Sequence, residues 1–122
     1  MYEIFLPGRV PSKKNNKHFA RLKNGRTLLL SSKNYLSWHE EMVKLLKDFE
    51  GEEIDFPIHI TYEFYMPDMR KCDISNKIES INDLLVDIHF LTDDNWQIIQ
   101  GFSAHAQLDR ENPGCKLTIN EI

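Results

Sequence analysis

A change of hydrophobic period between two neighbouring segments constrains the fold more than any other feature of this sequence. Residues 56–65 (FPIHITYEFY) are rich in aromatic and β-branched side chains with partial alternation, which predicts a strand. After Pro67, residues 75–88 carry apolar side chains at three- and four-residue spacing, which predicts a helix. Its expected buried stripe is Ile78, Ile81, Leu84, Leu85 and Ile88.

The other segments complete the expected set of elements. Residues 32–49 predict a second helix, and its aromatic residues Tyr35 and Trp38 are expected to pack in the core rather than to stack on bases. Three- and four-residue spacing also places Leu45, Leu46 and Phe49 on that stripe. The expected strands cover residues 2–6, 27–30, 56–65, 97–107 and 115–120, with a turn at Asn112-Pro113-Gly114.

This order, β(β)αβαββ, indicates one α+β domain over residues 1–122, with two helices packed on a mixed β-sheet. The segment 9–26 is rich in lysine and asparagine and poor in apolar residues, so we expect a long basic loop there.

Charge is distributed unevenly along the chain. There are 15 basic and 19 acidic residues, and the net charge of −4 would by itself argue against a nucleic-acid partner. From Ile4 to His39, however, the chain has no acid at all. One part is therefore suited to bind a polyanion and the other to bind cations, although a solvated loop would have the same composition. The basic residues of this part are Arg9, Lys13, Lys14, Lys17, Arg21, Lys23, Arg26 and Lys33.

Composition also indicates a compartment. No apolar run approaches the ~18–20 residues that a membrane span needs, and the N-terminal residues lack the pattern of a signal peptide. Cys72 and Cys115 have no zinc-site spacing and are expected to be reduced, structural thiols. We therefore expect a cytoplasmic protein without a membrane partner.

Acidic residues flank the 75–88 helix at both ends. Asp73 precedes its start, where a lone aspartate is usually a helix cap, and Asp93 and Asp94 follow its end. The strand after Asp94 must pack back along the sheet, and we expect this return to bring the pair towards Asp73 and the helix's polar face. Carboxylates ~4 Å apart repel by ~4 kcal/mol at an effective dielectric of 20, so such a cluster needs a cation, naturally Mg²⁺ or alternatively Mn²⁺. The polar face comprises Asn76, Ser80, Asp83 and Asp87.

Three blocks of this region, MPDMRKCDISNK, IESINDLLVD and LTDDNWQI, together with LPGRVPSKKNN near the start, resemble the RusA family of Holliday-junction resolvases. The resemblance covers nearly the whole chain in matching order and spacing. It implies a phage- or prophage-type, Mg²⁺-dependent endodeoxyribonuclease that cleaves four-way or branched DNA in recombination and repair, acting as a homodimer.

The resemblance also implies roles for individual residues. Asp73, Asn76, Asp83, Asp93 and Asp94 match the family's motif positions. Two positions depart from the pattern: Ser75 stands where the family has a second aspartate, and Glu79 stands where it has a functional lysine. Glu79 is expected to restore the missing charge, and Lys77 to supply the displaced cation.

The implied catalytic residues are therefore Asp73, Asp94 and Lys77, and the implied metal ligands are Asp73, Asp83, Asp93, Asp94 and Glu79. The expected DNA contacts are Lys13, Lys14, Asn15, Asn16, Lys17, Arg21, Arg26, Arg70 and Lys71. Two alternatives stay open: a branched-DNA binder whose catalytic site has decayed at Ser75, and a structural or interaction protein with a solvated basic loop.

Overall fold

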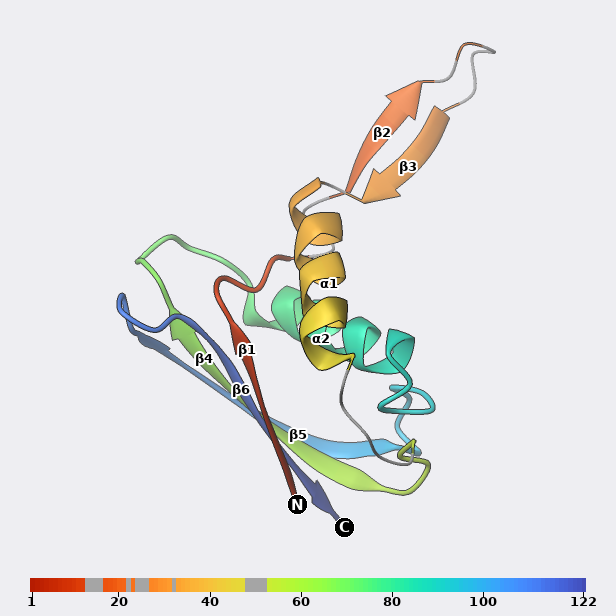
Figure 1. Cartoon of the computed structure of the whole chain (residues 1–122), viewed down its shortest axis with the longest axis vertical. Coiled ribbons are helices and arrows are strands. Elements are labelled where there is room, and N and C mark those ends of the chain that lie inside the picture. Colours follow the sequence, from red (N-terminus) through yellow and green to blue (C-terminus); the bar gives the residue numbers. More distant parts are fainter. Residues whose placement is uncertain (13–16, 22, 24–26, 32, 48–52) are drawn as a thin grey trace.

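Eight elements make up the described part of the chain. The computed structural model describes residues 1–12, 17–21, 23, 27–31, 33–47 and 53–122, with the backbone alone for 17–21 and 27–31. The elements in chain order (Figure 1) are β1 (Tyr2–Pro7), β2 (Lys17–Arg21), β3 (Thr27–Ser31), α1 (Lys33–Leu46), β4 (Ile58–Met66), α2 (Ile74–Asp87), β5 (Ile99–Leu108) and β6 (Gly114–Glu121).

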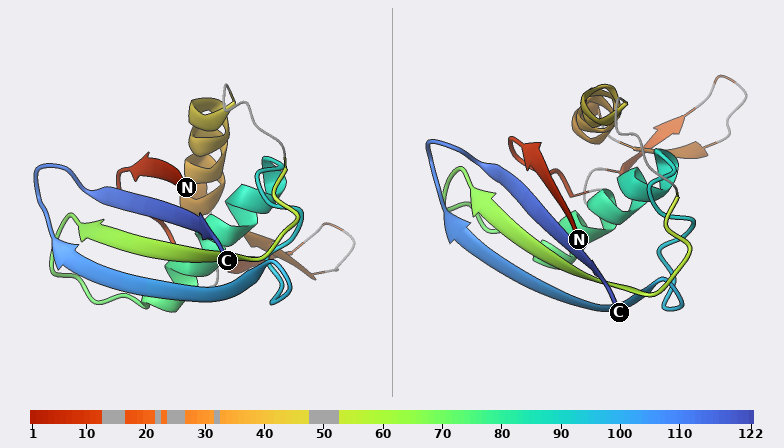
Figure 2. Two further views of the ribbon diagram at one scale, coloured as in Figure 1. Left: turned by 90° about the horizontal axis from the view of Figure 1, so that it is seen from below. Right: turned by 60° about the horizontal axis from the view of Figure 1, so that its bottom comes forward.

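Four strands form one mixed sheet in the order β1-β6-β4-β5. β4 pairs in parallel with β5 and antiparallel with β6, and β6 pairs antiparallel with β1. Because parallel neighbours need a crossover connection, the chain passes from β4 to β5 through α2. Figure 2 shows α1 and α2 on the same face of the sheet. The predicted α+β domain with two helices packed on a mixed sheet is confirmed.

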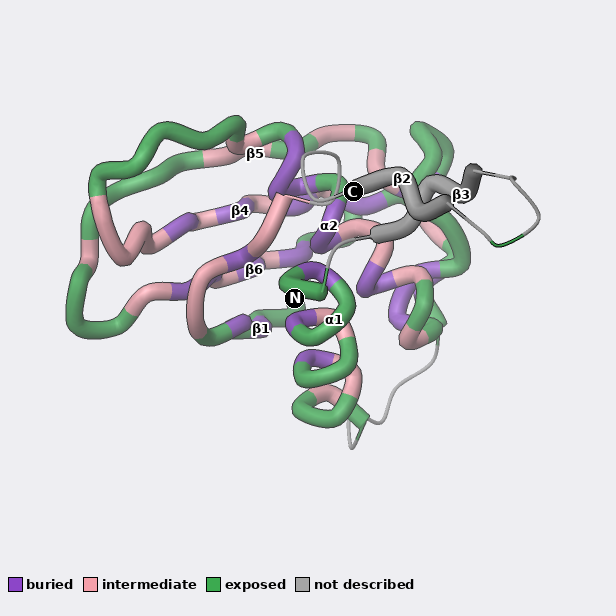
Figure 3. Tube along the Cα trace, turned by 90° about the horizontal axis from the view of Figure 1, so that it is seen from above, coloured by how far each residue is buried: buried purple, intermediate pink, exposed green. Residues whose placement is uncertain are grey.

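The core lies between this face of the sheet and the helices. Buried and partly buried side chains alternate along β4, and the buried ones include Tyr62 and Phe64 (Figure 3). Each fully buried apolar side chain contributes ~1.5–3 kcal/mol relative to its exposed state. The predicted stripe of α2 is confirmed for Ile78, Ile81, Leu84 and Leu85, which are buried, whereas Ile88 is half-buried.

The helix α1 and the segment before it differ from the sequence-based expectation. The segment 9–26 was expected to be a continuous loop, and this is wrong for residues 17–21, because β2 pairs antiparallel with β3 and the cross-strand pairing outweighs a weak local strand pattern. This hairpin projects away from the sheet beyond the start of α1 (Figure 1).

Tyr35 and Trp38 are buried as expected, but Leu45 is 52% exposed because it lies where α1 extends past the core. Phe49 lies outside the described residues.

Two further expectations concern the thiols and the membrane. Both cysteines are free, with Cys72 exposed and Cys115 buried, and burial raises the pKa of the Cys115 thiol to about 12. Among the described residues, no helix combines the length and the apolar character that crossing a membrane requires.

Candidate active site

The connection from α2 to β5 places Asp93 and Asp94 beside the C-terminal half of α2. The helix ends where His89 adopts a φ of 61°, a left-handed conformation that turns the chain away from the helix axis. The backbone N–H of Thr92 then donates to the carbonyl of Ile54 at 3.0 Å. Because the chain is fixed at His89 and again at Thr92, the residues that follow, Asp93 and Asp94, have a defined position.

Asp93 organises the loop that contains it. Its carboxylate accepts hydrogen bonds from the backbone N–H of Asp94 at 2.7 Å and from Nδ2 of Asn95 at 3.0 Å. The Asn95 side chain in turn accepts a hydrogen bond from the N–H of Gln97 at 2.9 Å. The bond from the Asp94 N–H, and after it the one from Asn95, lower the pKa of Asp93. Asp93 is therefore held as an anion by the loop itself.

The pKa of Asp94 is shifted in the opposite direction from that of Asp93. Partial burial and then its hydrogen bond with Asp93 raise the pKa of Asp94, and the charges of Asp83 and Asp93 raise it further. The carboxylate of Asp94 therefore lies within electrostatic reach of Asp83, on the third turn of α2. Two carboxylates that repel each other, at the edge of the folded core, form a donor set that suits a hard divalent cation.

The side chain of Tyr62, on the sheet, extends to the turn of α2 that carries Asp83. The hydroxyl of Tyr62 on β4 donates to Oδ1 of Asn82 on α2 at 2.5 Å. Burial is the main cause that raises the pKa of Tyr62, and the charge of Asp94 adds to it. Neither Tyr62 nor Asn82 was among the site residues predicted from the sequence. The polar hydroxyl of Tyr62 within the buried alternation of β4, and Asn82 directly before Asp83, are signals that could have identified them.

Asp73 lies at the opposite end of α2. It is the N-cap residue, with an extended backbone, and its exposed carboxylate accepts a 3.4 Å hydrogen bond from Nδ2 of Asn76. Ten residues of helix separate it from Asp83, which corresponds to ~15 Å along the axis.

The expected approach of Asp73 to the pair Asp93-Asp94 is therefore not found. β5 runs parallel to β4, so the residues that precede β5 and those that follow β4 lie at opposite ends of the sheet. Among the described residues, no group of three or more His, Cys, Asp or Glu side chains is arranged to hold a metal ion.

On the first turns of α2, some polar side chains are exposed and others are buried. Ser75 and Glu79 are both exposed and stand one turn apart. Lys77 is only 3% exposed, its Nζ donates to the carbonyl of Val10, and burial lowers the pKa of its amine. Ser80 is also buried, and its hydroxyl donates to the carbonyl of Pro11 at 2.8 Å.

The predicted cations fall into two groups. Arg70 and Lys71 are exposed just before α2. Asp68 accepts hydrogen bonds from the backbone N–H and Nε of Arg70, at 3.0 and 3.2 Å, and pairs with Arg9. The pKa of Asp68 is lowered, first by the bond from the Arg70 N–H. Lys13, Lys14, Asn15, Asn16 and Arg26 lie outside the described residues, and Lys17 and Arg21 lie on β2, where the backbone alone is described.

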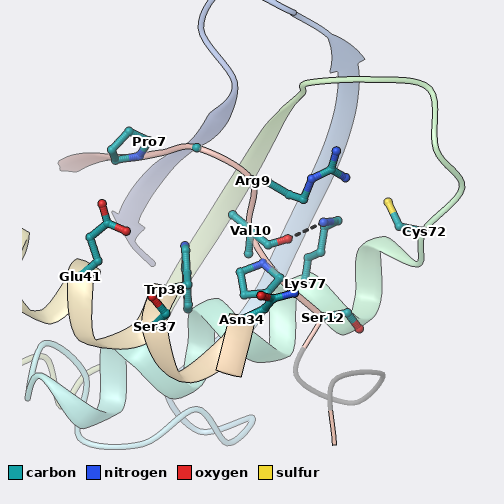
Figure 4. Close-up of a pocket in the computed structure, with 12 residues that line it drawn as sticks. Pro7, Arg9, Val10, Ser12, Asn34, Ser37, Trp38, Glu41, Cys72 and Lys77 are labelled. Atoms are coloured by element: carbon teal, nitrogen blue, oxygen red, sulfur yellow. Dashed lines mark hydrogen bonds between the residues drawn. The ribbon is translucent and has the colours of Figure 1, made fainter. Parts of the chain in front are cut away.

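A cavity of about 590 Å³ lies between α1, the first turns of α2 and the segment that follows β1 (Figure 4). Arg9 and Lys77 line it near Cys72, and Glu41 lines it from α1. This cavity is not predictable from the sequence, because it is formed by three segments that only the fold brings together.

Comparison with known proteins identifies the family. A comparison with curated proteins gives no match. The family model described as "Endodeoxyribonuclease RusA" matches residues 7–120, a span that includes both ends of α2, the loop with Asp93 and Asp94, all of β4 and β5, and β6 except its last residue. Because the match covers nearly all of the 122 residues, the chain belongs to the RusA family of endodeoxyribonucleases.

Proposed function

We propose that this protein is a metal-dependent, structure-selective endonuclease that hydrolyses phosphodiesters at Holliday junctions and other branched DNA, in recombination and repair. The whole chain would act as one cytoplasmic nuclease domain, encoded by a bacterium or a phage. What supports the proposal is the match to the endodeoxyribonuclease family over residues 7–120, together with the charge of Asp83 among the causes that raise the pKa of Asp94.

The chemistry follows from the charges at this position. Asp83 and Asp94 would hold Mg²⁺, or Mn²⁺ in its place, and the remaining ligands would be water and substrate phosphate, as is usual for Mg²⁺. When bound, the ion would stabilise the charge that develops on the phosphate oxygens. Asp93 keeps the loop in place through its hydrogen bonds, so Asp94 would hold the ion without a rearrangement of the backbone.

The other end of α2 would act on a different part of the DNA. We propose that Asp73 and Lys77, with Glu79 as a further carboxylate, contribute to the reaction as their motif positions imply. The ~15 Å between Asp73 and Asp83 along the helix exceeds the reach of one ion. Within one chain, these residues would therefore contact a phosphate several ångströms along the strand from the one beside Asp94.

DNA binding would involve the basic part of the chain. We propose that Lys13, Lys14, Lys17, Arg21 and Arg26 contact phosphates, with polar contacts from Asn15 and Asn16. Arg70 and Lys71 lie exposed directly before α2, where they would guide the backbone towards the carboxylates. A homodimer would match the two-fold symmetry of a four-way junction and present one site to each of two symmetric strands.

Incubation of the purified protein with a synthetic four-way junction and with a linear duplex of equal length, each with Mg²⁺ and with EDTA, tests the proposal. We expect symmetric nicks in the junction alone, and only with Mg²⁺. Binding of the junction without cleavage would favour the alternative that Ser75 has weakened catalysis. Equal cleavage of both DNAs would contradict structure selectivity.

A further inference from the structure

The cavity beside α1 has oppositely charged ends. Its two cationic side chains, Arg9 and Lys77, lie at the end near Cys72 and the start of α2, as Figure 4 shows. The carboxylate of Glu41 lies at the other end, on α1. Lys77 is almost fully buried, and an ammonium has three donors, of which the described contacts use one, to the carbonyl of Val10. Arg9 already pairs with Asp68, so Lys77 is the cation at this end whose donors the described contacts leave largely unused. This end is therefore suited to an anionic group, and the other end to a hydrogen-bond donor.

An unsatisfied donor lies in the wall between these ends. The indole of Trp38 lines the cavity and is only 7% exposed, and its Nε1 has no hydrogen-bond partner among the described residues. In Figure 4 the ring rises from α1 towards the segment that carries Arg9 and Val10. A buried donor without an acceptor is unfavourable and rare in folded proteins. Because this nitrogen is also shielded from solvent, an acceptor on a bound ligand would reach it after a small shift of the cavity wall.

The chemical groups of a nucleotide are complementary to those that line this cavity. Its phosphate is an anion, and its base carries ring nitrogens and carbonyls that accept hydrogen bonds, together with exocyclic amines that donate them. A phosphate alone would leave the wall of Trp38 and the carboxylate of Glu41 without a role. A volume of about 590 Å³ lies within the range of ordinary small-molecule sites.

We propose that this cavity binds one unpaired nucleotide of branched DNA, with its phosphate towards Arg9 and Lys77 and its base towards Trp38 and Glu41. The inference rests on the proposed function, because a branch point is where a duplex substrate offers bases that have left the stack at low cost. The cavity borders Cys72, the residue before Asp73, so the bound nucleotide would fix the register of the strand relative to α2.

Adjacent glutamates on α1 provide a matched pair of variants. Glu40 and Glu41 are both exposed acids, but only Glu41 lines the cavity. Loss of either charge alone would tighten binding to a polyanion slightly. We expect Glu41→Ala to weaken binding to a synthetic four-way junction by about tenfold, because an acceptor for the base is lost, and Glu40→Ala to leave it equal or slightly tighter. Junction affinities that are equal in the two variants would overturn the proposal.

A fluorescent base reports the nucleotide directly. 2-Aminopurine carries an exocyclic amine and emits strongly only when it leaves the base stack. It is placed either at the branch point or in the middle of an arm of the junction, and the wild-type protein is added without divalent metal to prevent cleavage. We expect emission to rise several-fold at the branch point and not in the arm, and the rise to be lost with Glu41→Ala and kept with Glu40→Ala. No rise with the junction fully bound, or an equal rise at both positions, would contradict the proposal.

The two proposals fail separately in these measurements. If the protein cleaves junctions in Mg²⁺ but the branch-point base gives no signal, the nucleotide site is wrong and the nuclease function stands. If the base gives the expected signal but no cleavage occurs in Mg²⁺ or Mn²⁺, the nucleotide site stands and the nuclease function is wrong.

Discussion

The hydroxyl of Tyr62 on β4 donates a 2.5 Å hydrogen bond to Oδ1 of Asn82 on α2, directly beside Asp83. This bond joins the central part of the sheet to the turn of the helix that carries one of the two paired carboxylates. Tyr62 is fully buried, so its hydroxyl would lose its partner if α2 shifted. The sheet thereby sets the position of Asp83 relative to the loop with Asp94.

A double-mutant cycle tests this connection. We expect Tyr62→Phe to lower the free energy of unfolding by ~1 kcal/mol, because one neutral hydrogen bond is lost while the ring is kept. Asn82→Ala in the Tyr62→Phe background should then have a smaller effect than in wild type, with a coupling energy of ~1 kcal/mol from urea titrations. Additive effects would mean that the bond contributes nothing to stability.

We expect the carboxylates of Asp83 and Asp94 to be essential for junction cleavage but dispensable for junction binding. We expect Asp83→Asn and Asp94→Asn each to abolish junction cleavage in Mg²⁺ and to leave junction affinity largely unchanged, because an amide keeps the size of the side chain but not the charge that a hard cation needs. Asp73→Asn tests the other end of α2 in the same assay, and we expect loss of cleavage there too. Near wild-type cleavage by any of the three variants would remove that residue from the site.

Binding of the ion should also be visible without cleavage. We expect Mg²⁺ to raise the melting temperature of wild-type protein in the absence of DNA, because an ion that binds only the folded state stabilises it. The increase should disappear in Asp94→Asn. Asp109→Asn is the control, since Asp109 is an aspartate in the turn after β5 whose carboxylate accepts hydrogen bonds from the backbone N–H groups of residues 111 and 112. An increase in Asp94→Asn that equals the wild-type value would show that the ion binds elsewhere.

Asp93 and Asp94 should affect stability in opposite directions. A lowered pKa means that the folded state favours charged Asp93, so this residue stabilises the fold above its unfolded pKa, and the contribution is lost as the pH falls through its folded pKa. The raised pKa of Asp94 means that its charge destabilises the fold, with the full penalty above its folded pKa. At pH 7 without metal, we expect Asp93→Ala to unfold at lower urea concentration than wild type and Asp94→Ala at higher. The difference should shrink as acid protonates both carboxyls. Two shifts of the same sign would contradict this assignment.

The basic segment 9–26, called here the basic arm, should determine the salt dependence of binding. If Lys13, Lys14 and Lys17 contact phosphates, their replacement by alanine should flatten the log–log salt dependence of junction binding by roughly one unit per lost contact. The control is the pair Lys44→Ala and Lys47→Ala, two exposed lysines at the end of α1, which should leave the slope unchanged. An unchanged slope in the arm variant would place the DNA on another surface.

The departure from the family pattern at the start of α2 is testable by metal titration. Ser75 and Glu79 are exposed and one turn apart, so a carboxylate at either position reaches the same space. If Glu79 restores the missing charge, Glu79→Gln should require more Mg²⁺ for half-maximal cleavage, and Ser75→Asp should rescue it in the double variant. Normal cleavage by Glu79→Gln at all Mg²⁺ concentrations would rule out compensation.

Local patterns predicted most of the elements but not how they meet. The apolar spacing of residues 75–88 identified α2 within one residue at each end, because burial of one helical face is a local property of the sequence. β2 was missed because its five residues have little strand pattern of their own and depend on β3. The separation of Asp73 from Asp94 follows from the parallel pairing of β4 and β5, which no local pattern specifies. Tyr62 and Asn82 each have a local signal in the sequence, but their mutual hydrogen bond depends on how α2 packs on β4, which no local pattern specifies.

The bonds from Lys77 and Ser80 to the consecutive carbonyls of Val10 and Pro11 connect two regions with different tasks. Val10 and Pro11 lie near the start of the basic segment 9–26, just before Lys13, whereas Asp83 stands one turn beyond Ser80 on the same helix. A movement of α2 along its axis would therefore carry the root of the arm and the carboxylate together. If the proposed function holds, the distance between the phosphates bound by Lys13 and its neighbours and the phosphate cut beside Asp83 would then stay constant while the protein adapts to DNA arms at different angles.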